Sequence, residues 1–316
     1  MNKSELIAKI KRLKAEKNAV ILAHYYQREE IQEVADFIGD SYALALRAAE
    51  SRAEIIVFAG VHFMAETAKI LNPERKVLLP DLNAGCSLAE SCEYEAFAQM
   101  RREFPDHVAV TYINCSAAVK TLSDIVCTSS NAEKIIRSLP ENQPILFAPD
   151  KNLGKYLERK TGRKMKLWDG ACVVHEAFSF QKLLQLYFEH PEAEILAHPE
   201  SEGDVLQAAH FIGSTSAMID YASKSNATVF IVATEVGILN EMKRAVGNKQ
   251  LIPAPSVEEN TCSCSECAYM KVNTLQKLYD CLKNESPEIF LDDTLIDQAA
   301  LPIHRMIQIT EYNEKV

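Results

Sequence analysis

The chain has 316 residues, of which 47% are hydrophobic and 25% charged, and its formal net charge at neutral pH is −10. This is the composition of an ordinary soluble protein that is long enough for two or three domains or one large core. The acidic balance argues against nucleic acid or an anionic membrane as the main partner, because both require a basic surface. No run approaches the roughly 18 apolar residues of a membrane span, and the charged N-terminal stretch is unlike a signal peptide. We therefore expect a cytoplasmic protein whose nine cysteines are thiols or metal ligands, not a disulfide framework.

The chain opens with a predicted helix, since Leu6, Ile7, Ile10 and Leu13 recur at helical spacing. A short, continuous apolar strand, AVILAH, follows and ends at His24. Two more such strands, IVFAG and KVLLPD, come next, separated by amphipathic stretches such as HFMAETAKIL. Continuous apolar strands that alternate with amphipathic helices are typical of a parallel sheet buried on both faces.

The same series occurs twice more along the chain. The second copy consists of HVAVTY, ILFAP and MKLWDG, and its first strand ends at Tyr112. The third copy consists of AEILAH, FIVAT and QLIPAP, and its first strand ends at His198. A hydroxyl residue stands seventeen positions after each first-strand end, and a cysteine follows each third strand. Landmarks that recur in register indicate a threefold internal repeat. The hydroxyl residues are Ser41, Ser129 and Thr215, and the cysteines are Cys86, Cys172 and Cys267.

We expect an α/β protein made of three similar three-layer α/β/α domains in a pseudo-threefold arrangement, because parallel strands need helical crossovers. The repeat places the domains at residues 1–88, 89–175 and 176–269, the last carrying the cysteine-rich segment EENTCSCSEC. The remaining residues, 270–316, are helical in pattern and have no fourth copy to join. We expect them to pack on the first domain beside the N-terminal helix.

The repeated landmarks all lie at strand ends, which has a consequence for ligand binding. In parallel α/β sheets, ligands bind beyond the carboxyl ends of the strands. His24, Tyr112 and His198 are therefore expected to line one central cavity with the three hydroxyls and the three cysteines. Three thiolates would leave one iron of a cubane cluster without a protein ligand, and such an iron is a Lewis acid. Glu235 and Asp150 end second strands and are expected to face the same cavity.

The motifs also match a family. From AHYYQ and GDSYA, through TYINCSA, CTSSNA and DGACVVHE, to AHPE, GSTSAM and CAYM, the chain resembles the quinolinate synthase family along nearly its whole length. The resemblance implies three Rossmann-like domains around one [4Fe-4S] cluster per chain, held by one cysteine from each domain, with one iron unligated by protein. It also implies a transferase that condenses iminosuccinate with dihydroxyacetone phosphate to quinolinate, phosphate and water for NAD biosynthesis. A functional link to an aspartate-oxidising enzyme is expected.

Carried onto this chain, the resemblance makes Cys86 and Cys172 the first two cluster ligands. Cys262, Cys264 and Cys267 compete for the third place. Cys267 fits best, because the ligand in the family precedes a C-P-x-M segment that opens a helix, and C-A-Y-M stands here. The upstream pair reads C-x-C where some members show C-x-x-C, so its role stays open. Three close thiols also suit half of a zinc ribbon, although no second CxxC or HxxxH supplies the other half.

The resemblance further implies a substrate site of ten residues. Among them, the carboxylate of Glu200 suits general acid/base work and the phenol of Tyr112 suits proton donation to leaving groups. His24 and His198 suit donation to anions or proton transfer near pH 7. Hydroxyls at helix N-termini can hold carboxylate and phosphate oxygens without a lysine, which reconciles an acidic chain with anionic substrates. The ten residues are His24, Tyr26, Ser41, Tyr112, Asn114, Ser129, His198, Glu200, Ser214 and Thr215.

Other interpretations stay open. The serine and threonine residues could serve only as helix caps, and His175, three residues after Cys172, carries no assigned role. As a whole, the chain could be an iron–sulfur or thiol sensor, a phosphosugar-binding protein without a cluster, or a hydro-lyase with an open-iron cluster. The remaining cysteines outside the cysteine-rich segment are interpreted as buried apolar residues: Cys92, Cys115, Cys127 and Cys281.

Overall fold

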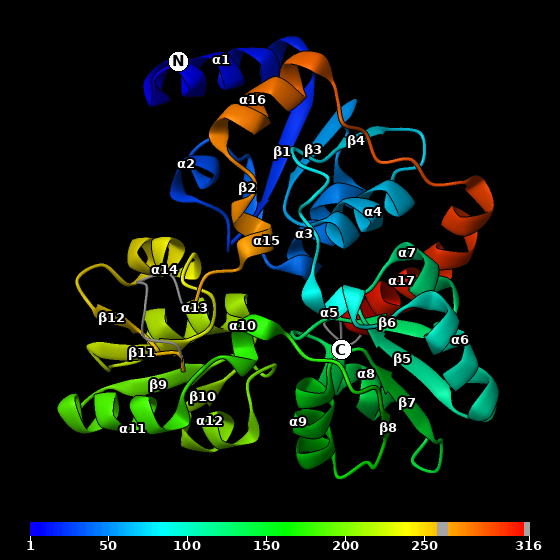
Figure 1. The fold of residues 1–316 in the computed structure, drawn as a ribbon, viewed down its shortest axis with the longest axis vertical. Helices are drawn as coiled ribbons and strands as arrows, with labels where there is room; N and C mark the ends of the chain where they lie inside the picture. Colours follow the sequence, from blue (N-terminus) through cyan, green and yellow to red (C-terminus); the bar gives the residue numbers. More distant parts are fainter. Residues whose placement is uncertain (258–264, 313–316) are drawn as a thin grey trace.

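The computed structural model describes residues 1–257 and 265–312. Within these residues, three four-stranded sheets lie in three lobes around a common centre (Figure 1). In each sheet the first strand along the chain lies between the second and the third, and the fourth pairs with the third. The prediction of an α/β protein with three similar parallel-sheet domains is therefore confirmed.

The first unit forms three layers. Alternate residues of its first strand point to opposite sides: Ile21 packs with Ile10 of the N-terminal helix, and Leu22 packs with Leu44 on the other face. Burial on both faces explains why these strands are continuous apolar runs. The unit contains α1 (Lys3–Glu16), β1 (Ala19–His24), α2 (Glu29–Gln32), β2 (Phe37–Gly39), α3 (Ser41–Glu50), β3 (Ile55–Ala59), α4 (His62–Leu71) and β4 (Lys76–Leu78).

The second unit repeats this arrangement. Leu146 of its third strand packs with Phe97 on one face, while the next residue, Phe147, packs with Leu153 on the other. The unit contains α5 (Ser87–Glu90), α6 (Tyr94–Glu103), β5 (Val108–Tyr112), α7 (Ala117–Thr121), β6 (Ile125–Cys127), α8 (Ala132–Ser138), β7 (Ile145–Ala148), α9 (Lys151–Thr161) and β8 (Lys166–Leu167).

The third unit is built in the same way. Ile231 packs with Leu183 on one face of the sheet, and Phe230 packs with Met218 and Met242 on the other. The described part of this unit contains α10 (Val173–Glu176), α11 (Phe180–Glu189), β9 (Glu194–Ala197), α12 (Gly203–Ala208), β10 (Phe211–Ile212), α13 (Thr215–Lys224), β11 (Val229–Ala233), α14 (Ile238–Val246) and β12 (Gln250–Pro253).

Strand register shows that the repeat is structural. In every sheet, the first and third strands along the chain pair in the same register. The last residue of the third strand is an alanine, and it pairs with the residue just before His24, Tyr112 or His198. His24, Tyr112 and His198 therefore occupy the same place in the three units. The paired residues are Ala23 with Ala59, Thr111 with Ala148, and Ala197 with Ala233.

Each sheet has one strand more than the three predicted per unit. These additional edge strands, β2, β6 and β10, are two or three residues long and stand shortly before the repeated hydroxyl residue. Segments this short show no periodicity of their own, and no repeated landmark marked them, in contrast to the equally short β4 and β8. They bring the chain back to the cavity edge immediately before Ser41, Ser129 and Thr215.

The C-terminal helices correct one prediction. Residues 270–316 were expected to pack on the first unit, and α16 (Leu275–Asn284) does so, placing Leu278 and Leu282 in the same core as α1. The long helix α17 (Asp293–Tyr312) instead packs mainly against α7, β6 and α8 of the second unit, with a smaller contact to α4 of the first. Its buried residues Ala299, Ile303 and Met306 join an apolar cluster that spans both units. A shared apolar core thus holds these two units together.

One further short helix, α15 (Ala268–Lys271), precedes α16 and lies close to the centre of the molecule (Figure 1). Among the helices that the structure describes, none has both the length and the apolar character needed to cross a membrane.

Candidate active site

A cavity of about 160 Å³ lies where the three units meet. All three units contribute to its wall, and the carboxyl ends of their strands point toward it, as expected for parallel α/β sheets. The predicted convergence of strand-end residues, hydroxyls and cysteines on one cavity is confirmed. The predicted residues that line it are His24, Tyr26, Ser41, Cys86, Tyr112, Asn114, Ser129, Cys172, His198, Glu200, Thr215 and Cys267.

Three cysteines stand at equivalent places in the wall. Each is the residue before the first turn of a short helix: Cys86 before α5, Cys172 before α10 and Cys267 before α15. In this position a sulfur can accept hydrogen bonds from free backbone N–H groups, as Cys86 does from Ala89 and Leu88. All three are partly exposed. The other described cysteines are buried, as predicted: Cys92, Cys115, Cys127 and Cys281.

The chemistry of the three thiols suits a soft metal centre. Burial raises the pKa of Cys86 to about 12 and that of Cys267 to about 11, and burial also raises the pKa of Cys172 well above its ordinary value. Without a cation the thiols are therefore protonated near pH 7. A bound metal would replace these protons and compensate the thiolate charges. The residues present thus fit a metal centre held by one cysteine from each of three positions around the cavity.

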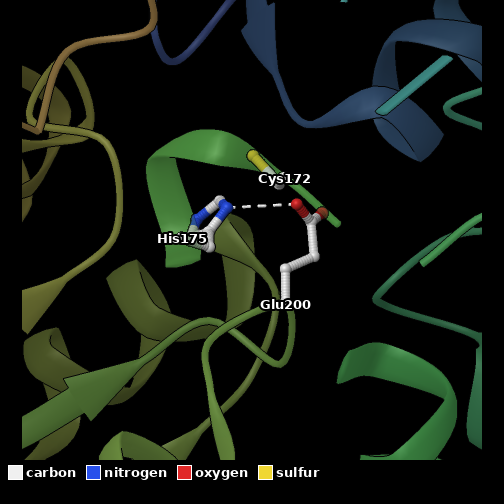
Figure 2. Close-up of side chains that lie close together, drawn as sticks. All are labelled: Cys172, His175 and Glu200. Atoms are coloured by element: carbon white, nitrogen blue, oxygen red, sulfur yellow. Dashed lines mark ion pairs between the residues drawn. The ribbon is translucent and has the colours of Figure 1, made fainter. Parts of the chain in front are cut away.

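Glu200 forms the centre of a second group. Its Oε1 accepts a hydrogen bond from the hydroxyl of Tyr112, and its Oε2 lies 3.0 Å from Nδ1 of His175. The rings of His175 and His198 stack with centroids 4.7 Å apart. Figure 2 shows His175, Glu200 and Cys172 lying together, and their possible ligand atoms are all within 4.8 Å of one another.

The electrostatics of this group keep Glu200 ionised. Burial raises the pKa of the carboxyl, but His175 and His198 outweigh this, and the net result is a pKa of about 2. Burial, and next the Glu200 charge, raise the pKa of Tyr112 well above its ordinary value, so the phenol stays protonated and donates. Burial lowers the pKa of His198 to about 3. This ring is therefore neutral near pH 7, and the ionised carboxylate is held by Tyr112 and His175.

The first unit contributes His24 and Tyr26. Nδ1 of His24 accepts a hydrogen bond from the backbone N–H of Tyr26 at 3.2 Å, and the two rings meet edge to face. Burial, and next the nearby His198, lower the pKa of His24 to about 3. Of the two roles expected for these histidines, donation by a neutral ring N–H is the one that this environment favours.

The predicted hydroxyl residues divide into two kinds. Ser41 and Thr215 are the first residues of α3 and α13, and the capping hydrogen bonds are made by the preceding residues, Asp40 and Ser214. The hydroxyls of Ser41 and Thr215 are thus left to line the cavity. Ser214 caps its helix and does not line the cavity. Ser129 lies in a turn before α8 and not at the helix N-terminus, and its hydroxyl lies 3.2 Å from Nε2 of His198.

Two acidic residues expected at the cavity have different surroundings. Glu235 lines the cavity, and its Oε1 lies 2.8 Å from Nζ of Lys271 and accepts from the backbone N–H of Cys267 at 3.2 Å. Asp150 does not line the cavity. It is buried and caps α9, accepting from the N–H of Leu153 at 2.7 Å, so the expectation for this residue was wrong.

Sequence reasoning assigned no role to His175, Thr234 or Lys271. His175 stands one helical turn after Cys172, which was a usable indication, and Thr234 directly follows the repeated alanine of β11. Lys271 has no counterpart in the repeat and could not have been found from it. The open question about Cys262 and Cys264 falls outside the described residues.

Comparisons with known proteins agree with this geometry. A family model described as "Quinolinate synthetase A protein" matches residues 8–308. A protein named quinolinate synthase from Microcystis aeruginosa (strain NIES-843 / IAM M-2473) is 55% identical over 306 residues, covering 97% of this chain and 95% of the relative. Its counterpart from Gloeothece citriformis (strain PCC 7424) is 56% identical over 307 residues, covering 97% and 94%. The chain therefore belongs to the quinolinate synthetase A protein family.

Proposed function

We propose that this protein is a quinolinate synthase that condenses iminosuccinate with dihydroxyacetone phosphate to quinolinate, phosphate and water in NAD biosynthesis. The observation that carries the proposal is the convergence of Cys86, Cys172 and Cys267 with the Tyr112–Glu200 pair on one cavity. Family membership supports the same conclusion. The enzyme would be classed as a transferase that forms carbon–carbon bonds.

The three cysteines would hold one [4Fe-4S] cluster per chain, with one iron free of protein ligands. Two observations support this assignment: the thiols come from three separate positions around one cavity, and backbone N–H groups already point at their sulfurs. Hydrogen bonds to sulfur are a recognised means by which proteins tune such clusters. When bound, the cluster would supply a Lewis acid to a substrate carboxylate, nitrogen or hydroxyl.

The anionic groups of both substrates would bind at helix N-termini. Ser41 and Thr215 present their hydroxyls at the first residues of two ten-residue helices, where free N–H groups and the helix dipole favour negative charge. Asn114 adds a buried Oδ1 that has no hydrogen-bond partner among the described residues, as expected for an atom that meets a ligand donor. His24 and His198 would donate from neutral rings, and Tyr26 and Ser129 would complete the wall.

Acid/base chemistry would centre on Glu200 and Tyr112. Glu200 is ionised and can take a proton from a substrate carbon or nitrogen, while Tyr112 is protonated and can give one to a departing oxygen. The hydrogen bond between them places the proton of Tyr112 against the negative charge of Glu200. Burial of both groups keeps water away from a reactive imine.

We place the reaction in the cytoplasm, linked in function to an aspartate-oxidising enzyme. The seven described cysteines are all free, which suits a reducing compartment. Iminosuccinate is an oxidation product of aspartate, so an enzyme of that class would supply the substrate.

The test is quinolinate formation by anaerobically purified protein given both substrates. We expect product from the wild type, none from Cys172→Ser, and wild-type rates from Cys281→Ser, whose sulfur is buried in the core between α1 and α16. An iron-loaded wild type that forms no quinolinate would contradict the proposal. Equal activity of the Cys172→Ser variant would contradict the role of the three thiols.

A further inference from the structure

A series of hydrogen-bonding groups runs behind the cavity wall. The phenol oxygen of Tyr26 lies 2.8 Å from Oγ1 of Thr234, and this oxygen lies 2.9 Å from Nε2 of His175. The other ring nitrogen, Nδ1, lies 3.0 Å from Oε2 of Glu200, the contact drawn in Figure 2. Oε1 of Glu200 accepts from Tyr112. Two phenols that line the cavity, one from the first unit and one from the second, are thus joined to one carboxylate.

The hydroxyl of Thr234 lies at the middle of this series. It is within hydrogen-bond distance of the phenol oxygen of Tyr26 on one side and of Nε2 of His175 on the other. A hydroxyl can donate one hydrogen bond and accept others, so it can serve both neighbours at once.

Thr234 has a special place because it does not touch the cavity. It is 1% exposed, it follows directly after β11, and it is not part of the cavity wall. Its hydroxyl is the hydrogen-bond partner of both Tyr26 and His175, a role that an apolar side chain of the same shape could not fill. Loss of this hydroxyl would separate Tyr26 from the rest of the series.

We propose that Thr234 is a positioning residue whose hydroxyl holds Tyr26 of the first unit and the His175 ring, which lies beside Glu200, in one fixed arrangement behind the cavity wall. This inference rests on the proposed function, because it concerns how residues of that reaction's site are held in place. It extends the set of residues that the reaction needs beyond those that can touch a substrate.

The kinetic test compares Thr234→Val with Thr234→Ser. Valine keeps the shape and removes the hydroxyl, whereas serine keeps the hydroxyl. We expect Thr234→Val to lower kcat about tenfold or more, less than the 10²–10⁴ of a whole acid/base group, with KM nearly unchanged. Serine should restore kcat. Thr310→Val is the matched control, since it removes a buried, hydrogen-bonded hydroxyl on α17, outside the cavity wall.

A spectroscopic test needs no substrate. 3-Fluorotyrosine is placed at position 26 or, in a separate protein, at position 112, and the ¹⁹F resonance is recorded. Thr234→Val should move the resonance of the label at both positions, because the series connects them, and Thr234→Ser should return both toward their starting values.

Three results would overturn the proposal: a Thr234→Val enzyme with wild-type kcat, equal losses of kcat in the valine and serine variants, or an unchanged resonance at position 112. If the wild type itself forms no quinolinate, the proposed function fails instead. The ¹⁹F measurement then decides on the hydrogen-bonded series alone.

Discussion

Replacing Glu200 by glutamine tests the acid/base assignment most sharply. The carboxylate accepts from Tyr112 through one oxygen and lies 3.0 Å from Nδ1 of His175 through the other. A carboxamide has one oxygen and one NH₂ group, so an NH₂ group would replace one of the two oxygens that make these contacts. The variant also cannot take up a proton near neutral pH, although its size and shape are preserved.

The expected loss can be estimated from the role. Removing a general acid/base group lowers the rate by about 10²–10⁴, which corresponds to about 3–5 kcal/mol of transition-state stabilisation. KM should change much less, because we propose that the anionic groups of the substrates bind at the N-termini of α3 and α13 and not at Glu200. The assay is the initial rate of quinolinate formation, with iron per chain measured in the same preparation.

Glu176→Gln provides a matched control. Glu176 directly follows His175, and its side chain pairs with Lys151 at 3.2 Å outside the Glu200 group. The same change of charge at this position should leave kcat close to that of the wild type. A Glu200→Gln enzyme with normal kcat and normal iron content would refute the reasoning.

Three further predictions concern stability, pH and substrate binding. Lys271→Met leaves the fully buried Glu235 without its ion-pair partner and should lower the free energy of unfolding by about 3–5 kcal/mol in urea denaturation; a loss below about 1 kcal/mol would be inconsistent with this pair. Hydrogen bonds, first from Lys17, lower the pKa of Glu285 to about 2 from an ordinary 4.5, so these contacts stabilise the fold above pH 4.5 and are lost as the pH falls toward 2. Glu285→Gln should therefore lower the free energy of unfolding at pH 7 but not near pH 2. An equal difference between variant and wild type at both pH values would argue against the stabilising role of these contacts. Thr215→Val removes a hydroxyl from the start of α13 and should raise KM for an anionic substrate about tenfold with little change in kcat; an unchanged KM for both substrates would exclude that contact.

Much of the fold could be predicted because the repeated segments include strands that are fully buried. Every residue of Ile55–Ala59 and of Val229–Ala233 is buried, so both had to be apolar and stood out as continuous runs. The positions of His24, Tyr112 and His198 followed from the ends of such runs. The edge strands β2, β6 and β10 could not be found in this way, because two or three residues carry no period and no repeated landmark marked them.

The limits of the site prediction have a similar physical origin. Residues at strand ends, such as Glu235, could be placed because strand ends converge. Convergence does not predict which of these side chains will instead cap the following helix. Asp150 and Ser214 are the N-caps of α9 and α13, and their side chains accept hydrogen bonds from those helices. The partners of Thr234 and Lys271 are far away in the sequence, which therefore does not display these contacts. The partners of α17 depend in the same way on which units share an apolar core.

Iron and acid-labile sulfide per chain, measured in anaerobically purified protein with its visible spectrum, test the assignment of the three cysteines most directly. We predict about four of each and a brown protein that bleaches in air, with loss of iron when Cys86, Cys172 or Cys267 is replaced by serine. Zinc or no metal in a folded preparation, after an attempt at reconstitution, would contradict the cluster and with it the proposed chemistry of the cavity.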